Sequence, residues 1–303
     1  MALNTLSFAS KYSSELDKML VQKSATGFLA DNIFRAKFVG AKTVIVPDID
    51  FVGLADYDRD NGFSKAGMTV SQTPFTLTKD RARKLMIDRE DMDETGIANL
   101  SGQVLGEYVR TKVVPEMDAY VLSNLYKVAS DNGNTGAYAA KTVIADFLAG
   151  VNKVQDTAGF DEELVAFIDS TMYSALMTST EISRQIIVSD FKQGDVNLKV
   201  KTLNGVALIP VSSERMRTEY TFSDGIEATE GGFAAAAGAG YIRSLIMPKK
   251  AASLVKKTET MRIFTPEQNK DADAYEFNYR LYYDVFVKKS NLKTIYAITE
   301  AAV

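Results

Sequence analysis

The chain's clearest hydrophobic pattern is a long apolar stripe with a helical repeat. Apolar side chains recur there at intervals of three or four residues: Ile97, Leu100, Val104, Leu105, Tyr108, Val109, Val113, Met117, Tyr120, Val121, Leu125 and Val128. The spacing predicts a helix of about 33 residues, roughly 50 Å long. Pro115 lies inside the pattern and cannot donate a helical hydrogen bond, so we expect the helix to kink or split there.

Ahead of this helix, two extended stretches flank a polar segment. Residues 43–52 are rich in β-branched side chains, and alternation resumes at Met68 after the polar run 55–67. Together they predict a β-hairpin of about 40 residues, far longer than the usual connection of about 2–5 residues. A lone two-stranded hairpin is marginally stable in water. Because its arms offer few apolar residues besides Val44, Val46 and Phe51, we expect it to need a partner surface.

The segment after the long helix alternates between helical and extended patterns. Residues 141–154 and 172–184 have helical patterns, and residues 163–168 and 206–211 look like strands. The glycine- and alanine-rich run 225–240 predicts a loop. We interpret this segment as a mixed α/β subdomain inserted after the helix.

The C-terminal part of the chain is extended. Apolar and polar residues alternate over 275–287, which predicts a long strand with one apolar face. Tyr282 and Phe286 interrupt its polar side, so we expect the second face to be partly covered. Further strands of the same sheet are predicted at 242–247, 253–264 and 292–299. At the other end of the chain, one short amphipathic helix is predicted from Phe8, Tyr12, Leu16, Met19 and Leu20.

Composition narrows the possible chemistry. The 303 residues include no cysteine, histidine or tryptophan, which excludes disulfides, Cys/His zinc sites and catalysis by a thiol or an imidazole. The 35 Lys and Arg against 39 Asp and Glu give a formal net charge of −4, unlike a dedicated nucleic-acid binder. Neither a signal peptide nor a run of about 20 apolar residues is present, so we expect a soluble protein made inside a cell.

Three segments resemble known binding motifs but lack residues that those motifs require at fixed positions. Residues 56–62 look like the start of a calcium loop, but Asn61 and Gly67 stand where an EF-hand needs Gly and Glu. Residues 136–142 lack the glycine that precedes the lysine of a phosphate-binding loop. Residues 238–240 lack the third glycine of a dinucleotide-binding fingerprint.

Two charged clusters also have structural explanations. The acidic cluster could supply paired carboxylates for acid–base catalysis. Acidic residues ahead of a helix also interact favourably with the positive end of its dipole, which is a structural role. A group of lysines has no interleaved aromatic residues that would stack on bases, so it is as consistent with a solvated face. The clusters are Asp88, Glu90, Asp91, Asp93 and Glu94, and Lys249, Lys250, Lys256 and Lys257. We assign no catalytic, cofactor-binding or metal-binding residue and expect no cofactor.

The order of these parts resembles the major capsid proteins of tailed bacteriophages, which share the Hong Kong 97-type fold. A polar arm, a long hairpin, a charged bridge, a very long helix, an α/β insert and returning strands follow one another. The strings DREDMDE, VVPEMDAYVLSNLY, VALIPVSSERM and KKTETMRIFTPEQNKDADAYEFNYRLYYDVFV are similar to those of phage and prophage capsid proteins. The resemblance covers nearly the whole chain and implies an α+β fold.

The resemblance also implies a division of the chain. Residues 1–40 would form an N-terminal arm, 41–85 an extended β-hairpin (the E-loop), 86–135 the part of the peripheral domain with the spine helix, 136–240 the axial domain, and 241–303 the remaining strands of the peripheral domain. The spine helix itself would lie at 95–130.

The implied function is that of a major capsid (head) protein without enzymatic activity. Such a protein assembles with itself as hexamers and pentamers into an icosahedral shell around double-stranded DNA, which it contacts non-specifically, without a membrane. It is made in the host bacterial cytoplasm and ends in the virion capsid. Since only residues 1–40 precede the hairpin, a separate scaffolding protein is expected, besides a portal. Cross-linking through Lys65 is not expected, because no partner Asn or activating acid is identified.

Two alternatives stay open at this point. An encapsulin-like nanocompartment shell resembles the same fold but encloses cargo enzymes. From another class, a carboxylate- or Lys-dependent enzyme could use the acidic cluster at residues 88–94.

Overall fold

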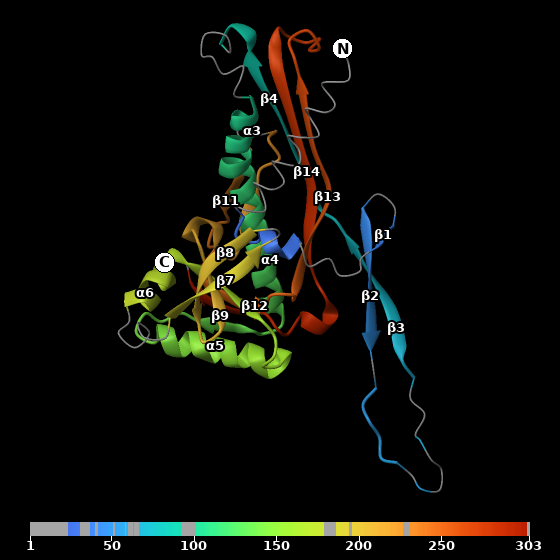
Figure 1. The fold of residues 1–303 in the computed structure, drawn as a ribbon, viewed down its shortest axis with the longest axis vertical. Coiled ribbons are helices and arrows are strands. Elements are labelled where there is room, and N and C mark those ends of the chain that lie inside the picture. Colours follow the sequence, from blue (N-terminus) through green and yellow to red (C-terminus); the bar gives the residue numbers. More distant parts are fainter. Residues whose placement is uncertain are drawn as a thin grey trace.

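The computed structural model describes residues 24–30, 37–39, 42–50, 52–57, 59, 63, 67–91, 101–178, 186–193, 196–226 and 231–301. Two sheets of different size lie on either side of a long helix, and a narrow hairpin projects away from the body (Figure 1). The short helix predicted at the N-terminus, residues 92–94 of the charged bridge (79–94), the start of the predicted long helix up to residue 100, and Lys65 lie outside the described residues.

The long helix is interrupted, as Pro115 predicts. It consists of α3 (Ser101–Tyr108), the π-helical segment η3 (Val109–Val113) and α4 (Val114–Asp131). The N–H of Val114 donates to the carbonyl of Val109, five residues earlier, and Pro115 stands in the first turn of α4. Proline has no N–H for the preceding turn, and the wider π turn accommodates this loss within one continuous helix.

A three-stranded antiparallel sheet lies along this helix. Its order is β13 (Ala252–Phe264), β14 (Ala274–Val287) and β4 (Lys79–Asp88). The charged bridge expected after the hairpin is therefore mainly a strand. Its residues alternate between the side that faces α4, where Arg81 forms an ion pair with Glu116, and the outer face, where Asp80 forms one with Arg280. Both faces of β14 are largely buried near its C-terminal end, as Tyr282 and Phe286 predicted.

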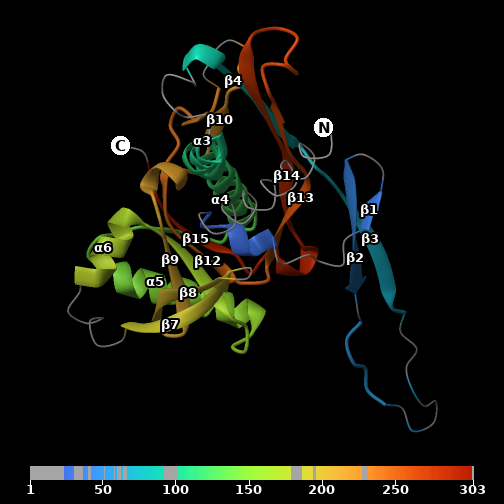
Figure 2. The same ribbon diagram turned by 45° about the horizontal axis from the view of Figure 1, so that its top comes forward.

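A seven-stranded mixed sheet forms the other body. Its order is β5 (Thr135–Ala137), β15 (Tyr296–Glu300), β12 (Tyr241–Pro248), β6 (Leu164–Asp169), β9 (Val206–Val211), β8 (Val196–Leu203) and β7 (Ile186–Gln193). The helices α5 (Val143–Ala158) and α6 (Ser170–Thr178) pack against it. Figure 2 shows them beside this sheet, away from α4.

The predicted strand 242–247 forms, and of the predicted strand 292–299 only residues 296–299 do. Neither belongs to the sheet of residues 275–287, so that expectation is wrong. β12 pairs with β15 and with β6 of the insert. Alternation of apolar and polar residues reveals a strand but does not show which strands pair with it. β12 is buried along nearly its whole length, because packed layers cover both of its faces. The run 225–240 is also more ordered than predicted, because β11 (Phe233–Ala235) pairs with β10 (Tyr220–Phe222).

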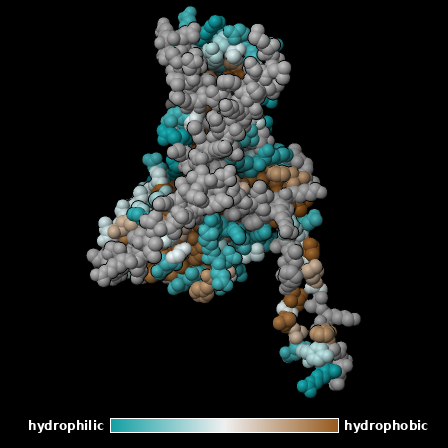
Figure 3. Space-filling view, in the orientation of Figure 1, coloured by the Kyte–Doolittle hydropathy of each residue, from teal (hydrophilic) through white to brown (hydrophobic). Residues whose placement is uncertain are grey.

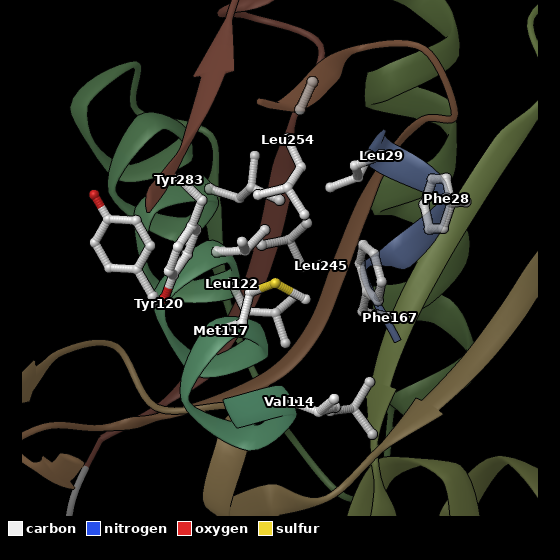
Figure 4. Close-up of a cluster of buried hydrophobic side chains, with 14 of the residues drawn as sticks. Phe28, Leu29, Val114, Met117, Tyr120, Leu122, Phe167, Leu245, Leu254 and Tyr283 are labelled. Atoms are coloured by element: carbon white, nitrogen blue, oxygen red, sulfur yellow. The ribbon is translucent and has the colours of Figure 1, made fainter. Parts of the chain in front are cut away.

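Two cores fill the body. The larger one surrounds α4 and takes side chains from both sheets, including Met117, Leu122 and Leu245 (Figure 4). The second lies between the seven-stranded sheet and the helices α5 and α6. Alternate residues of β6 serve the two cores, since Phe167 faces the first and Ile168 the second.

Candidate assembly interface

The projecting hairpin is the part of the described structure that stands away from either core. β2 (Thr43–Asp50) pairs antiparallel with β3 (Thr69–Thr76), and the short strand β1 (Lys37–Val39) lies on the outer side of β2. Thr43 faces Thr76 at the root and Asp50 faces Thr69 at the far end, which leaves residues 51–68 as the hairpin tip. The long hairpin predicted from the sequence is confirmed, and it extends well beyond the body in two views (Figures 1 and 2).

Apolar packing fixes the root of the hairpin to the three-stranded sheet. Val44 and Val46 of β2 are buried together with Leu77 against side chains of β13 and β14. The ring of Phe75 lies 4.9 Å from that of Phe286. These residues form a small cluster of their own: Val44, Val46, Leu77, Val255, Tyr282 and Phe286. Phe51, the third apolar residue singled out in the sequence, lies outside the described residues.

A buried carboxylate completes the root at the turn from β3 to β4. Asp284 Oδ2 accepts hydrogen bonds from the backbone N–H of Thr78 at 2.8 Å and from its hydroxyl at 2.9 Å. The other oxygen accepts from the Tyr120 hydroxyl at 2.8 Å. Burial raises the pKa of Tyr120 well above its ordinary value, so the phenol stays protonated as the donor. Helix α4, strand β14 and the hairpin root are thereby joined at one point.

Beyond the root, the hairpin exposes large apolar side chains. Leu54 is fully exposed and Phe63 is 88% exposed, with the ring of Tyr57 edge-on to Phe63 at 5.2 Å. The exposed set is Val52, Leu54, Tyr57, Phe63, Met68 and Val70. Figure 3 shows the same gathering as brown atoms along the projecting arm. Single exposed apolar residues are ordinary, but a group of them on one thin arm is typical of a surface that binds a partner.

The rejected motifs have structural roles where the structure describes them. Asp56 is exposed, while Asp58, Asp60, Asn61 and Gly62 lie outside the described residues. Gly136 belongs to β5, where a Cβ would collide with the Tyr296 hydroxyl, and a Cβ at Gly240 would lie 2.7 Å from the carbonyl oxygen of Glu300. Both glycines therefore allow close packing.

The charged clusters form local contacts. Asp88 accepts a hydrogen bond from the N–H of Glu90, and Asp91 is exposed, while Asp93 and Glu94 lie outside the described residues. Lys249 pairs with Glu163 at 2.9 Å and Lys256 with Glu259 at 3.7 Å, whereas Lys257 lies over the ring of Phe38 and Lys250 is exposed. Among the described residues, no three acidic side chains come together in a group that could hold a metal ion.

A hollow of about 380 Å³ lies against the three-stranded sheet and has basic residues in its lining. Lys84 lies 2.7 Å from Glu276, and Arg280 lies 2.6 Å from Asp80. Neighbouring carboxylates therefore balance the charges of these two residues. Within the described part of the chain, none of the helices has both the length and the apolar character that crossing a membrane requires.

Sequence reasoning missed three buried carboxylates that join distant elements: Asp118, Asp169 and Asp284. Asp169 contacts Arg243, which also donates to Glu300 at 2.6 Å, so β6, β12 and β15 are tied together. A signal was available for two of them. Asp118 stands inside the apolar stripe of the long helix, and Asp284 interrupts the aromatic run 282–286.

Comparison with known proteins adds to this picture at the level of the fold. The chain matches no protein-family model, and no curated protein matches it in sequence. Solved structures do match. The mature capsid of bacteriophage PhiM1 gives a TM-score of 0.56 at 12% identity, covering 85% of this chain and 82% of that one.

Two further structures agree with it. The capsid of cyanophage P-SCSP1u gives a TM-score of 0.56 at 11% identity, over 86% of this chain and 84% of that one. A structure from Gordonia phage Cozz gives 0.55 at 14% identity, over 86% and 81%. With its long helix between two sheets and its projecting hairpin, the chain has the α+β, Hong Kong 97-type fold of phage capsid proteins.

Proposed function

We propose that this chain is the major capsid protein of a tailed phage, a structural protein that assembles with itself into an icosahedral head. The observation that carries the proposal is the projecting hairpin (Figure 1), whose apolar residues beyond the root are exposed. Burial of one large apolar side chain stabilises by about 1.5–3 kcal/mol, so several on each arm supply a substantial driving force for association. Repetition around a closed shell multiplies this contribution.

In this proposal the parts of the chain have distinct tasks. Residues 1–40 are the arm, of which 24–30 are buried in this chain's own body, and residues 41–85 are the hairpin, whose tip reaches neighbouring copies. Residues 86–135 and 241–303 are the peripheral domain, and 136–240 is the axial domain near the five-fold and six-fold axes. Because β12 pairs with both β15 and β6, residues 241–303 and 136–240 contribute strands to one sheet. A separate scaffolding protein and a portal would complete assembly, and the net charge of −4 would limit adhesion of packaged DNA to the shell.

Electron microscopy and sedimentation of the purified protein test the proposal. We expect closed shells, and uniform small particles under every assembly condition would contradict it. A variant in which Asn-Gly replaces residues 51–68 keeps the root strands and closes them with a tight turn. This variant should fold but form no shells.

The contents of shells purified from the native host separate the two shell hypotheses. A phage head encloses double-stranded DNA, whereas a nanocompartment encloses a cargo enzyme. Closed shells with cargo protein and without DNA would favour the nanocompartment.

A further inference from the structure

Residues 24–30 form a short buried segment between the two bodies. Ser24 and Thr26 are almost completely inaccessible, and so are Phe28 and Leu29 of the 3-10 helix η1 (Gly27–Ala30). The segment thus buries two hydroxyl side chains together with its apolar ones, and buried hydroxyls need hydrogen-bond partners. Something specific must hold it in place.

The group that holds it is Asp118, near the N-terminal end of α4. Its Oδ1 accepts hydrogen bonds from the Ser24 hydroxyl at 2.6 Å, the Thr26 hydroxyl at 2.7 Å and the Thr26 N–H at 3.2 Å. Its Oδ2 accepts from the N–H of Ala25 at 3.1 Å and from Arg215 at 3.3 Å. The carboxylate is completely buried, and the loss of any one of these donors is costly because the charge has no access to water.

Arg215 gives this carboxylate a second connection. It ends the 3-10 helix η4 (Ser213–Arg215), which follows β9 of the seven-stranded sheet. The same side chain of α4 therefore holds the N-terminal segment on one side and the approach to the larger sheet on the other. Asp169 anchors Ser213 in turn, through a hydrogen bond of 3.1 Å from its hydroxyl.

The rest of the segment packs between the two sheets. The ring of Phe28 stacks on that of Phe167 in β6, with centroids 5.9 Å apart, and η1 also lies against β13 of the three-stranded sheet. Figure 4 shows Phe28 beside Phe167, with Leu29 turned toward Leu254 of β13. One short segment therefore touches both sheets and the helix between them.

We propose that residues 24–30 are a strap that fixes the angle between the seven-stranded and three-stranded sheets, with Asp118 as its positioning residue. The strap is covalently continuous with residues 1–23, so a force or a contact on that end of the chain acts on the angle between the bodies. This inference concerns the single chain and stands whether or not the chain forms shells.

Spin-label distance measurement tests the strap directly, because the chain has no cysteine of its own. Ala82→Cys on β4 and Asn152→Cys on α5 place one label on an exposed position of each body. In full-length protein, diluted with unlabelled chains so that only distances within one chain are measured, we expect one narrow distribution. Ser24→Ala with Thr26→Ala, and separately Asp118→Asn, should broaden or shift it. Asp131→Asn, an exposed acid at the end of the same helix, should leave it unchanged.

Amide hydrogen exchange in the same variants shows whether the strap has been released. Loss of hydrogen bonds to a charged group should accelerate exchange at residues 25–29 by about 10- to 100-fold. Accelerated exchange with an unchanged distance distribution would overturn the proposal, because the strap would then have no effect on the angle. Unchanged exchange in both variants would overturn the role of Asp118. If Asp118→Asn does not fold, the serine–threonine variant decides, since it keeps the carboxylate and its backbone donors.

Discussion

At the scale of single residues, buried carboxylates hold distant parts of this chain together. Asp118 joins the strap, α4 and η4, while Asp284 joins the hairpin root, α4 and β14. Each receives donors from several elements, so its desolvation is offset only when all of those elements are in place. In a chain without cysteine or histidine, such junctions supply the long-range specificity that disulfides or metal sites give other proteins.

Buried tyrosines make the fold sensitive to alkaline pH. Burial raises the pKa of Tyr279 and Tyr283 well above the ordinary value of 10.0, and it acts in the same direction on Tyr120 and Tyr220. Below pH 10 these phenols are neutral in both states. Above it the unfolded chain releases their protons while the folded chain retains them, so stability falls with rising pH.

Lys79 has the opposite effect on stability over a limited range of pH. Burial lowers the pKa of Lys79 below 10.5, so its contribution rises with pH up to that value and is constant above it. We therefore expect net loss of stability above about pH 10.5. After a rapid alkaline jump, ultraviolet absorbance should show the exposed tyrosines ionising at once and the buried ones only at the rate of unfolding. Immediate ionisation of all 14 tyrosines with the fold intact would contradict the prediction.

At the scale of elements, close packing of α5 on the seven-stranded sheet outweighs helix propensity. Gly150 lies inside α5, where Ala would be favoured by about 1 kcal/mol on propensity alone. A Cβ at that position would lie 2.8 Å from the Tyr296 ring and 3.0 Å from Ile246. We expect Gly150→Ala to lower the free energy of unfolding by about 1–3 kcal/mol, since overpacking forces the sheet and helix apart.

Urea unfolding followed by circular dichroism measures this change. Thr157→Ala, at an exposed position of the same helix, is the matched control and should change stability by less than about 0.5 kcal/mol. A stabilised Gly150→Ala variant would show that propensity decides and that the helix can move away from β15.

Local patterns predicted most elements but not their neighbours. The stripe from Ile97 and the proline at 115 predicted the long helix and its interruption, and alternation predicted the hairpin and the long strand β14. The sheet membership of β12 and β15 could not be predicted, because residues far apart in sequence decide the pairing and each strand's own pattern is the same in either sheet. The hairpin surface was foreseen from its lack of core residues. The junction at Asp118 was not foreseen, because its hydrogen-bond donors lie far from it in the sequence, at residues 24–26 and at residue 215.

At the scale of the whole molecule, apolar surface is divided between two uses. The cores around α4 and under α5 bury their side chains within one chain, whereas the hairpin displays its apolar residues outside it. A junction of packed rings and a buried carboxylate fixes the hairpin's root, so its direction is set before any partner arrives. A pre-set direction lowers the entropy lost on association.

This division predicts that assembly and stability can be separated by mutation. Leu54→Ser with Phe63→Ser removes two exposed apolar side chains from the tip, so we expect the monomer's unfolding free energy to change by less than about 0.5 kcal/mol. Shell formation, measured by sedimentation velocity and electron microscopy, should be lost. Each copy loses about 3–6 kcal/mol of the stabilisation that burial of the two side chains would give to the assembly. Phe160→Ser is the control, since Phe160 is 74% exposed on the turn after α5 and does not belong to the hairpin. Shells formed equally well by both variants would mean that the tip does not drive association.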